Sequence, residues 1–246
     1  IDEATIECEN VSFLPLRAEL EREDRRYEPI SFQLRDVAVL TGPNMGGKSV
    51  ALRTCGFIAV LAAFGLPVPA TAARIGLFDE ISWLGIGGDE DAEGGLLSSF
   101  AREVVRLRDL LERRALRTVL LIDEFARTTT PHEGKALLVA LVDALRKRGK
   151  LAFVATHLAG VASATGARHF AVRGLRSVPR QRRVAGDLNA ALAALGDSMD
   201  YSIVEVIDGK DRQADAIALA HLLGLDEEIV ALAGHVLASE AEQSGV

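Results

Sequence analysis

The residues best suited to chemistry form one short stretch, Thr41-Gly-Pro-Asn-Met-Gly-Gly-Lys-Ser49. It fits the pattern G-x-x-x-x-G-K-[ST], the phosphate-binding P-loop. Glycines let the backbone curl so that several N–H groups face one anion. Lys48 would place a charge on the β- and γ-phosphates, and the Ser49 hydroxyl could ligate Mg²⁺. The residues expected to bind the nucleotide are Gly42, Pro43, Asn44, Met45, Gly46, Gly47, Lys48 and Ser49.

Two carboxylates follow an apolar run further along the chain, Thr118-Val-Leu-Leu-Ile-Asp123-Glu124. An apolar strand that ends in Asp behind a P-loop is the Walker-B pattern, and Asp123 would hold Mg²⁺ opposite Ser49. The adjoining Glu124 is well placed to polarise an attacking water. The alternative is an exposed pair of acids at a strand end. The two motifs together predict an ATPase that uses ATP and Mg²⁺, with Ser49 and Asp123 at the metal.

A histidine follows another apolar run, Leu151-Ala-Phe-Val-Ala-Thr-His157. Residues at the carboxyl ends of parallel strands in a nucleotide-binding sheet face the ligand crevice. We therefore expect His157 to sense the γ-phosphate or the attacking water. The predicted catalytic residues are Lys48, Glu124 and His157.

The elements around these motifs predict an α/β fold. A short apolar strand, 36–41, precedes the P-loop, and an apolar helix follows it to about Gly65, with its positive end at the phosphates. The runs that end at Asp123 and His157 read as buried parallel strands. Helices are expected at 98–111 and 131–148, on the flanks of the sheet. We expect a mainly parallel sheet flanked by helices.

Flanking segments extend this architecture. Alternating apolar residues within 1–40 predict an antiparallel β layer, interrupted by a charged, solvated loop at 19–28. Further strands are expected at 74–84, 168–183 and 200–207. The acidic, glycine-rich segment 85–95 is either a functional loop or a surface linker. A terminal helical pair, 211–223 and 226–238, would pack on a partner subunit or cover the sheet. We divide the chain into an ATPase domain, 1–210, and a helical dimerisation element, 211–246.

Two further features leave alternatives open. Tyr27 lies upstream of the P-loop, where it could stack on adenine or lie half-buried in its loop. Six arginines between 168 and 183 could meet nucleic acid or an acidic partner, or protect a solvated sheet edge.

Composition narrows the class of protein. The 246 residues are 49% hydrophobic and carry a net charge of −7, so there is no general electrostatic footprint for nucleic acid. The two cysteines, Cys8 and Cys55, form no disulfide framework, and the longest apolar run is broken by Gly65 and two prolines. We expect a cytoplasmic protein without membrane contact. The start at Ile1 suggests a fragment of a longer polypeptide or a processed start.

With these motifs placed, the chain resembles the ATPase domain of the MutS family, ABC-type ATPases best known from DNA mismatch repair. The Pro-Asn-Met filling of the P-loop is peculiar to that family. The segments Leu121-Ile-Asp-Glu-Phe-Ala-Arg127, Glu133-Gly134 and Ala155-Thr-His157 match its later motifs. The resemblance runs over nearly the whole chain, and the helices within 214–233 resemble the family's dimer-forming tail.

The resemblance implies a composite site, in which two subunits pair and each P-loop is completed by a signature serine of the other. That serine would be Ser98. Glu124 would be the base, Asp123 the Mg²⁺ residue and His157 the switch histidine, while Asn44 would help to sense the γ-phosphate. The implied partners are ATP and a homodimer or related subunit. DNA would bind through domains N-terminal to Ile1.

The chain departs from the family pattern where subunits meet. Leu96-Leu97 replaces a Gly-Arg before the signature serine, Ala92 replaces an Asp, and 126–131 replaces a Gly-Arg-Gly-Thr-Ser-Thr segment. These differences weaken two expectations: that these segments contact the partner subunit, and that they couple the nucleotide to the clamp. Three functions remain open: an ATPase motor acting on mismatched DNA, a MutS-like ATPase that reactivates an adenosylcobalamin-dependent aminomutase or another protein client, and a nucleotide-gated scaffold with little turnover.

Overall fold

The computed structural model describes residues 4–43, 46–85, 99–113, 117–175, 198–207 and 216–244. The chain divides into two compact units, one of residues 1–172 and 201–212 and the other of residues 173–200 and 213–246. Each unit is described by itself.

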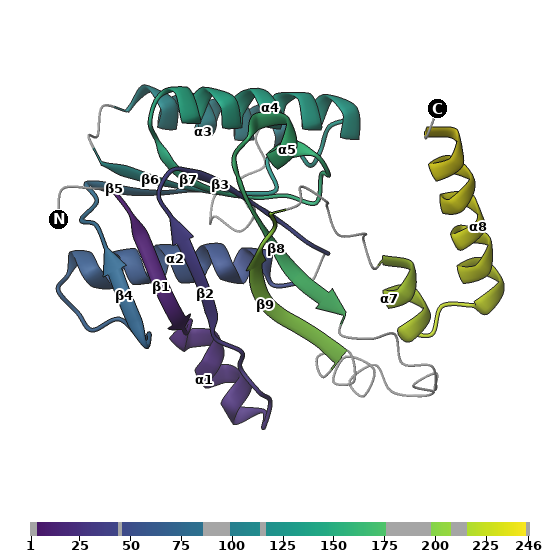
Figure 1. Cartoon of the computed structure of the whole chain (residues 1–246), viewed down its shortest axis with the longest axis horizontal. Helices are drawn as coiled ribbons and strands as arrows, with labels where there is room; N and C mark the ends of the chain where they lie inside the picture. The colour runs from purple at the N-terminus through teal and green to yellow at the C-terminus, as the bar shows by residue number, and fades with distance from the viewer. Residues whose placement is uncertain are drawn as a thin grey trace. The chain divides into compact units, whose positions relative to one another are not determined.

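A six-stranded sheet forms the centre of the larger unit (Figure 1). Its strands, in spatial order, are β5 (Glu80–Leu84), β6 (Thr118–Asp123), β7 (Leu151–Ala155), β3 (Val37–Thr41), β8 (Arg168–Leu175) and β9 (Met199–Glu205). The pairs β5–β6, β6–β7, β7–β3 and β3–β8 are parallel, which confirms the mainly parallel sheet. Because β6, β7 and β3 are adjacent and parallel, their carboxyl ends lie at one edge of the sheet.

A smaller antiparallel sheet confirms the expected N-terminal β layer. Its order is β2 (Ile30–Leu34), β1 (Ile6–Val11) and β4 (Ala72–Ile75). Cys8 pairs with Phe32 on one side of β1 and with Ala73 on the other. The 74–84 strand region is therefore two strands, of which β4 joins this layer and β5 joins the large sheet.

The solvated loop expected at 19–28 is wrong in its first part, because Leu14–Arg22 forms a helix, α1. Pro15 lies in its first turn, where a missing N–H is tolerated. Arg17 and Glu21 form an exposed ion pair one turn apart, at 2.8 Å. No side chain of α1 is buried, so its leucines Leu14, Leu16 and Leu20 do not pack into a core as an apolar stripe normally does.

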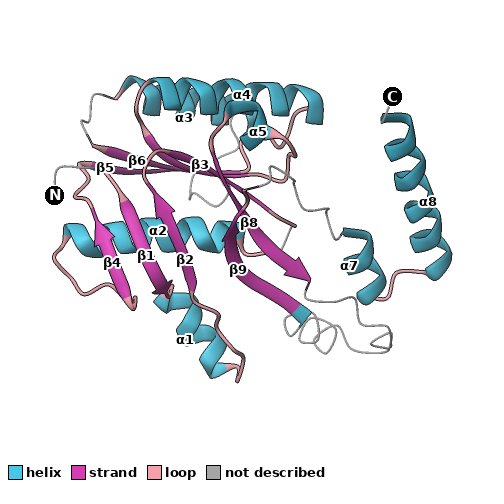
Figure 2. Cartoon of the chain, viewed as in Figure 1, coloured by secondary structure: helices cyan, strands magenta, loops and turns pink. Residues whose placement is uncertain are grey.

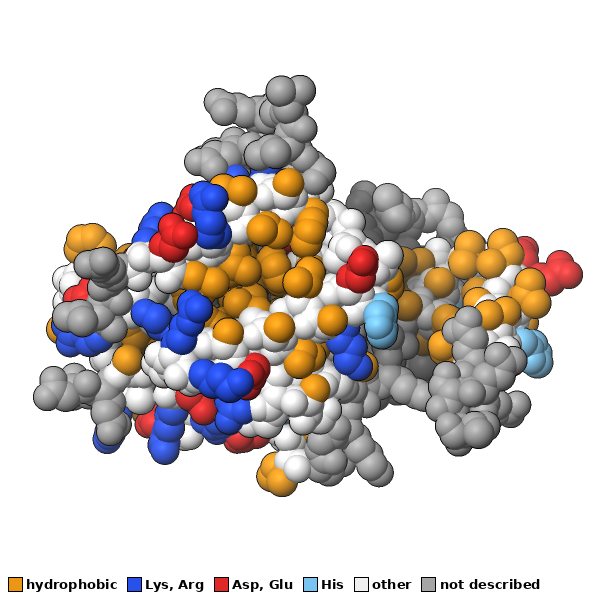
Figure 3. Space-filling model, turned by 90° about the horizontal axis from the view of Figure 1, so that it is seen from above, with side chains coloured by type: hydrophobic (Ala, Val, Ile, Leu, Met, Phe, Trp, Pro, Cys, Tyr) orange, Lys and Arg blue, Asp and Glu red, His pale blue; other side chains and the backbone are white. Residues whose placement is uncertain are grey.

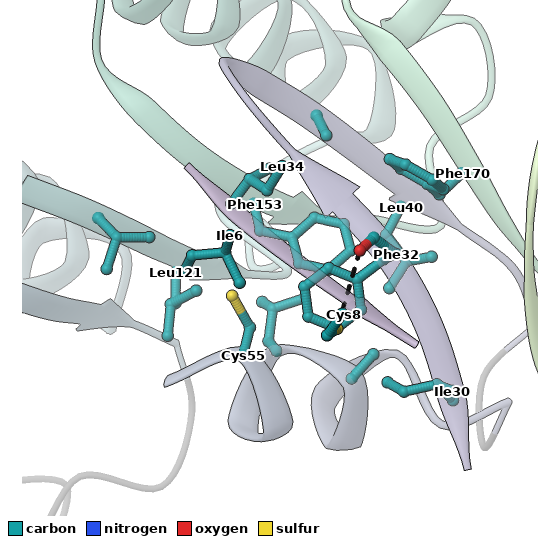
Figure 4. Close-up of a cluster of buried hydrophobic side chains, with 14 of the residues drawn as sticks. Ile6, Cys8, Ile30, Phe32, Leu34, Leu40, Cys55, Leu121, Phe153 and Phe170 are labelled. Atoms are coloured by element: carbon teal, nitrogen blue, oxygen red, sulfur yellow. Dashed lines mark hydrogen bonds between the residues drawn. The ribbon is translucent and has the colours of Figure 1, made fainter. Parts of the chain in front are cut away.

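Helix α2 (Lys48–Ala63) follows the P-loop and lies between the two sheets (Figures 1 and 2). Its buried residues join a core with β1, β2 and one face of the large sheet. Phe153 is fully buried there and contacts Phe32 and Phe170 at ring-centroid distances of 5.5 and 6.1 Å. Cys8 and Cys55 are both buried in this core, and the Cys8 thiol faces the Phe32 carbonyl (Figure 4).

Helices α3 (Ser99–Glu112), α4 (Pro131–Lys147) and α5 (Val161–Thr165) cover the opposite face of the sheet (Figure 2). Alternate strand residues point to the two faces, so Leu40 and Leu121 contact the α2 core whereas Val39 and Ile122 contact the α4 core. The outer side of α3 and α4 mixes apolar and charged side chains (Figure 3).

Helix α4 has a strong N-terminal cap. The Thr130 hydroxyl accepts a hydrogen bond from the Glu133 N–H and donates one to the Glu133 carboxylate at 2.8 Å. The Thr130-x-x-Glu133 spacing is that of a capping box, but the Glu133 carboxylate accepts from the Thr130 hydroxyl rather than from its backbone N–H; Pro131 lies at the first helical position. The cap fixes where the chain leaves the turn after β6.

The smaller unit contains the predicted helical pair, α7 (Ala216–Leu222) and α8 (Glu227–Ser244). Gly224, in the turn between them, has a φ of 87°, which a glycine adopts without strain. No helix in the described ranges is long and apolar enough to cross a bilayer.

The basic segment 168–183 is described only as far as residue 175. Arg168 donates two hydrogen bonds of 2.9 Å to the Glu205 carboxylate. Arg173 lies 3.6 Å from Asp200. The remaining four arginines lie outside the described residues, and the two that are described make ion pairs within the protein.

Candidate functional site

The P-loop connects β3 to α2, and its close packing explains its glycines. At Gly46 a Cβ would lie 2.9 Å from the Pro43 carbonyl oxygen, too close for any side chain. Gly47 has a φ of 89°, and its Cβ position is 3.3 Å from the Tyr201 ring. The loop therefore requires glycine at both positions. Asn44 and Met45 lie outside the described residues.

Lys48 is the first residue of α2 and its side chain is 5% exposed. Its ammonium donates to the carbonyls of Gly42 and Pro43, at 2.9 and 3.1 Å. It also lies 3.3 Å from Glu124 Oε1. The loop carbonyls and the carboxylate thus hold one positive charge at the mouth of the P-loop.

Glu124 follows the last residue of β6 in a left-handed conformation, with a φ of 58°. Its N–H donates to the Ala155 carbonyl at the end of β7, at 3.0 Å. Its Oε2 contacts Nδ1 of His157, which lies two residues beyond the end of β7. The three predicted catalytic side chains, Lys48, Glu124 and His157, therefore meet at one edge of the sheet.

Asp123 lies beside this group and is 7% exposed. Burial raises the pKa of its carboxyl, and the nearby Glu124 charge acts in the same direction. A hydrogen bond with Ser49 and the charges of Lys48 and Arg53 act in the opposite direction. Among the described residues, Asp123 Oδ1 is buried without a hydrogen-bond partner.

These features fit a divalent cation. A buried, unpartnered carboxylate oxygen beside a serine hydroxyl offers the hard oxygen ligands that Mg²⁺ prefers. Ser49 and Asp123, predicted from the two motifs, are brought together by the fold.

Of the other two predicted site residues, Tyr27 and Ser98, the structure describes only Tyr27. Tyr27 lies in the loop before β2, half-buried, and its hydroxyl accepts a hydrogen bond of 2.8 Å from the Phe13 N–H. This matches the half-buried loop tyrosine, and stacking on adenine stays a prediction. Ser98 lies outside the described residues, as do Ala92 and Leu96-Leu97.

Three neighbours of the site carry no signal in the sequence. His169 of β8 is buried and contacts the Thr41 hydroxyl at 2.7 Å, at the end of β3 where the P-loop begins. Tyr201 of β9 lies against Gly47. Glu103 of α3 accepts a hydrogen bond from the Ala126 N–H at 3.0 Å. Each approaches the site from a distant part of the chain, and no local pattern indicates that approach.

The fold and the site define a P-loop nucleotide-binding domain of the ATPase class. Residues 38–240 match the family model described as MutS domain V. The chain belongs to this family, and MutS domain V is an ABC-type ATPase domain.

Over most of its length the chain is similar to proteins with two different names, MutS2 and MutS. The chain is 31% identical over 217 residues to Endonuclease MutS2 of Shouchella clausii, which covers 87% of the chain and 25% of that protein. It is 29% identical over 211 residues to DNA mismatch repair protein MutS of Methanosarcina barkeri, covering 85% of the chain and 21% of that protein. The chain thus spans about a quarter of the length of these relatives.

Proposed function

We propose that the chain binds ATP with Mg²⁺ and hydrolyses it at a site that a second subunit completes, and that this cycle drives conformational change in DNA repair. The observation that carries the proposal is the meeting of Lys48, Glu124 and His157 at the carboxyl edge of the sheet. Each of these groups follows the carboxyl end of a parallel strand, Lys48 after β3 and the P-loop, Glu124 after β6 and His157 after β7, at the edge where such sheets bind ligands.

Phosphate binding would fall to the P-loop and the start of α2. The first hydrogen bond of α2 runs from the Ala51 N–H to the Gly47 carbonyl at 2.9 Å. The N–H groups of the first helical turn have no acceptor within the helix, so they are available to an anion. Lys48 adds a full charge beside them, at the position where the loop closes.

Glu124 would act as the general base that orients the attacking water. Its two oxygens have different neighbours, since Oε1 faces Lys48 and Oε2 faces His157. The carboxylate is thus fixed in direction beside the cation that would contact the γ-phosphate. Hydrolysis of ATP depends mostly on such positioning and on charge stabilisation. His157 would report the state of the γ-phosphate through its contact with Glu124.

Ser49 and Asp123 would hold Mg²⁺, which neutralises phosphate charge when bound. The orphaned Oδ1 of Asp123 supports this assignment.

Exposed apolar side chains on α8 support the proposal that a second subunit binds. Four of them are at least half exposed, and apolar side chains gathered on one helix commonly mark an interaction surface. They are Ile229, Leu232, Val236 and Leu237. We propose that 211–246 contributes to dimerisation and that Ser98 reaches the nucleotide of the partner.

DNA is the client that the relatives favour. One name that recurs among them is DNA mismatch repair protein, and the other is an endonuclease, an enzyme that cleaves a nucleic acid. No described feature of this chain specifically favours an aminomutase client. We therefore propose a role in the binding and repair of mismatched or damaged DNA.

The proposal is tested by the mass of Glu124→Gln in solution, measured by light scattering with and without Mg·ATP. Blocked hydrolysis should trap the ATP-bound pair, so the mass should double with ATP and not with ADP. The control is the double variant Lys48→Ala/Glu124→Gln, which should remain at the mass of one chain. If ATP binds to Glu124→Gln and the mass does not change, the composite site is wrong.

A further inference from the structure

The turn after β6 carries the catalytic carboxylate in an unfavourable backbone conformation. Glu124 and Ala126 have φ values of 58° and 61°. Both residues carry a Cβ, which crowds the backbone in this left-handed region. Such a turn persists only where its surroundings hold it in place.

Three elements hold this turn. The Ala155 carbonyl of β7 accepts from the Glu124 N–H at 3.0 Å. Gly134 of α4 lies against the turn, and a Cβ added there would be 3.1 Å from the Ala126 carbonyl oxygen. The third is α3, whose Glu103 reaches across to accept from the Ala126 N–H at 3.0 Å. The first two use the backbone, whereas the third is a side chain that substitution can remove.

The surroundings of Glu103 disfavour the ionised form of its carboxyl. It is half-buried, and burial raises the pKa of its carboxyl, while the Ala126 N–H and the charge of Arg127 act in the opposite direction. A carboxylate kept half-buried against a backbone N–H fixes the direction of that N–H more firmly than a neutral acceptor would. Its hydrogen bond therefore constrains the turn between β6 and α4.

We propose that Glu103 is a positioning residue, whose hydrogen bond to the Ala126 N–H holds the turn that aims the Glu124 carboxylate at Lys48 and His157. The inference rests on the proposed role of Glu124 as the base. Since α3 begins at Ser99, the same bond links the segment after the expected signature serine to the base. A shift of α3 would then alter hydrolysis without altering the P-loop.

The test uses two conservative variants with opposite defects. Glu103→Gln keeps the length and an acceptor oxygen but loses the charge, whereas Glu103→Asp keeps the charge and loses reach. Single-turnover ATP hydrolysis should be roughly ten- to a hundredfold slower for Glu103→Asp, a fraction of what a general base contributes. Glu103→Gln should stay within about threefold of wild type, because its amide oxygen can still accept from the N–H. The dissociation constant for ATP should change less than about threefold in both.

The control is Asp109→Asn, an exposed acid on the same helix that pairs with Arg108, and it should leave the rate unchanged. Each Glu103 variant is also measured in a Glu124→Gln background, where it should cause no further loss because Glu103 acts through Glu124. An equal loss in both backgrounds, or a Glu103→Asp rate equal to wild type, overturns the inference. If Glu124→Gln itself turns over like wild type, the assigned base is wrong, and that result is visible without any Glu103 variant.

Discussion

Replacing Lys48 with Ala should weaken ATP binding sharply, and the structure allows the size to be worked out. The ammonium already has three acceptors, two loop carbonyls and Glu124, at 2.9–3.3 Å. Phosphate oxygens would therefore replace or share these acceptors rather than meet a bare charge. A hydrogen bond to a charged group contributes about 1.5–3 kcal/mol. A net difference of one such hydrogen bond gives about 1.5–3 kcal/mol. At 1.4 kcal/mol per tenfold change, this corresponds to roughly 10- to 140-fold weaker binding.

Isothermal titration calorimetry with ATP and Mg²⁺ measures this affinity directly. The matched control is Lys147→Ala, which removes a lysine from the exposed end of α4. Lys147 is 73% exposed and pairs with Asp143 one helical turn away, a contact of little energetic value on the surface. Its removal should leave ATP affinity unchanged.

Cooperative thermal unfolding of both lysine variants confirms that each is folded. If Lys48→Ala then binds ATP within about threefold of wild type, the P-loop assignment is refuted. Equal losses in Lys48→Ala and Lys147→Ala would likewise refute a specific phosphate contact.

Three further predictions concern residues of the larger unit: Asp123, Gly47 and the two buried cysteines. Asp123→Asn should make the nucleotide-free protein more stable at pH 7, because burial raises the pKa of Asp123 above its ordinary value of 3.8 and folding then disfavours its ionised form. The stability advantage of Asp123→Asn should grow as the pH rises above 3.8 and vanish well below pH 3.8, where residue 123 is protonated in both the folded and the unfolded chain. Urea unfolding at several pH values measures this difference, and a difference that stays constant with pH would contradict the prediction. Gly47→Ala should weaken ATP binding, because its φ of 89° and the Tyr201 ring at 3.3 Å force the loop to move, whereas Gly234→Ala, with open space around it in α8, should leave affinity unchanged. Cys8 and Cys55 should resist iodoacetamide at pH 8 in the folded protein and react in urea, since burial raises the pKa of Cys8 to about 12 and that of Cys55 further; labelling of the folded protein would show the core to be more open.

The parallel core and the central site could be predicted because their signals are local. The runs that form β6 and β7 are continuously apolar and end in polar residues, and all of their residues are buried. The loop before Lys48 has the glycine and Gly-Lys-Ser spacing that is typical of a phosphate-binding loop. Since parallel strands share a carboxyl edge, the order of the motifs was enough to bring Lys48, Glu124 and His157 together.

The predictions that were wrong or missing concern α1, β4 and Glu103, whose surroundings depend on distant parts of the chain. Helix α1 contains three leucines but buries none of its side chains, and the charged run from Glu19 onward favoured a loop in the sequence. Strand β4 is separated from β5 by only residues 76–79, but it pairs with β1, more than sixty residues earlier in the chain. Glu103 is one of several acids on an amphipathic helix, and only the packing of α3 against the turn reveals its partner.

The central claim is that Glu124 drives ATP hydrolysis beside Lys48, and one measurement tests it most directly. Single-turnover hydrolysis by wild type and Glu124→Gln should be compared at saturating ATP, with the affinity of each measured in parallel. Loss of a general base predicts a rate roughly 10²–10⁴-fold lower in Glu124→Gln, with affinity for ATP retained. Equal rates in the two proteins would contradict the account and favour a nucleotide-gated scaffold.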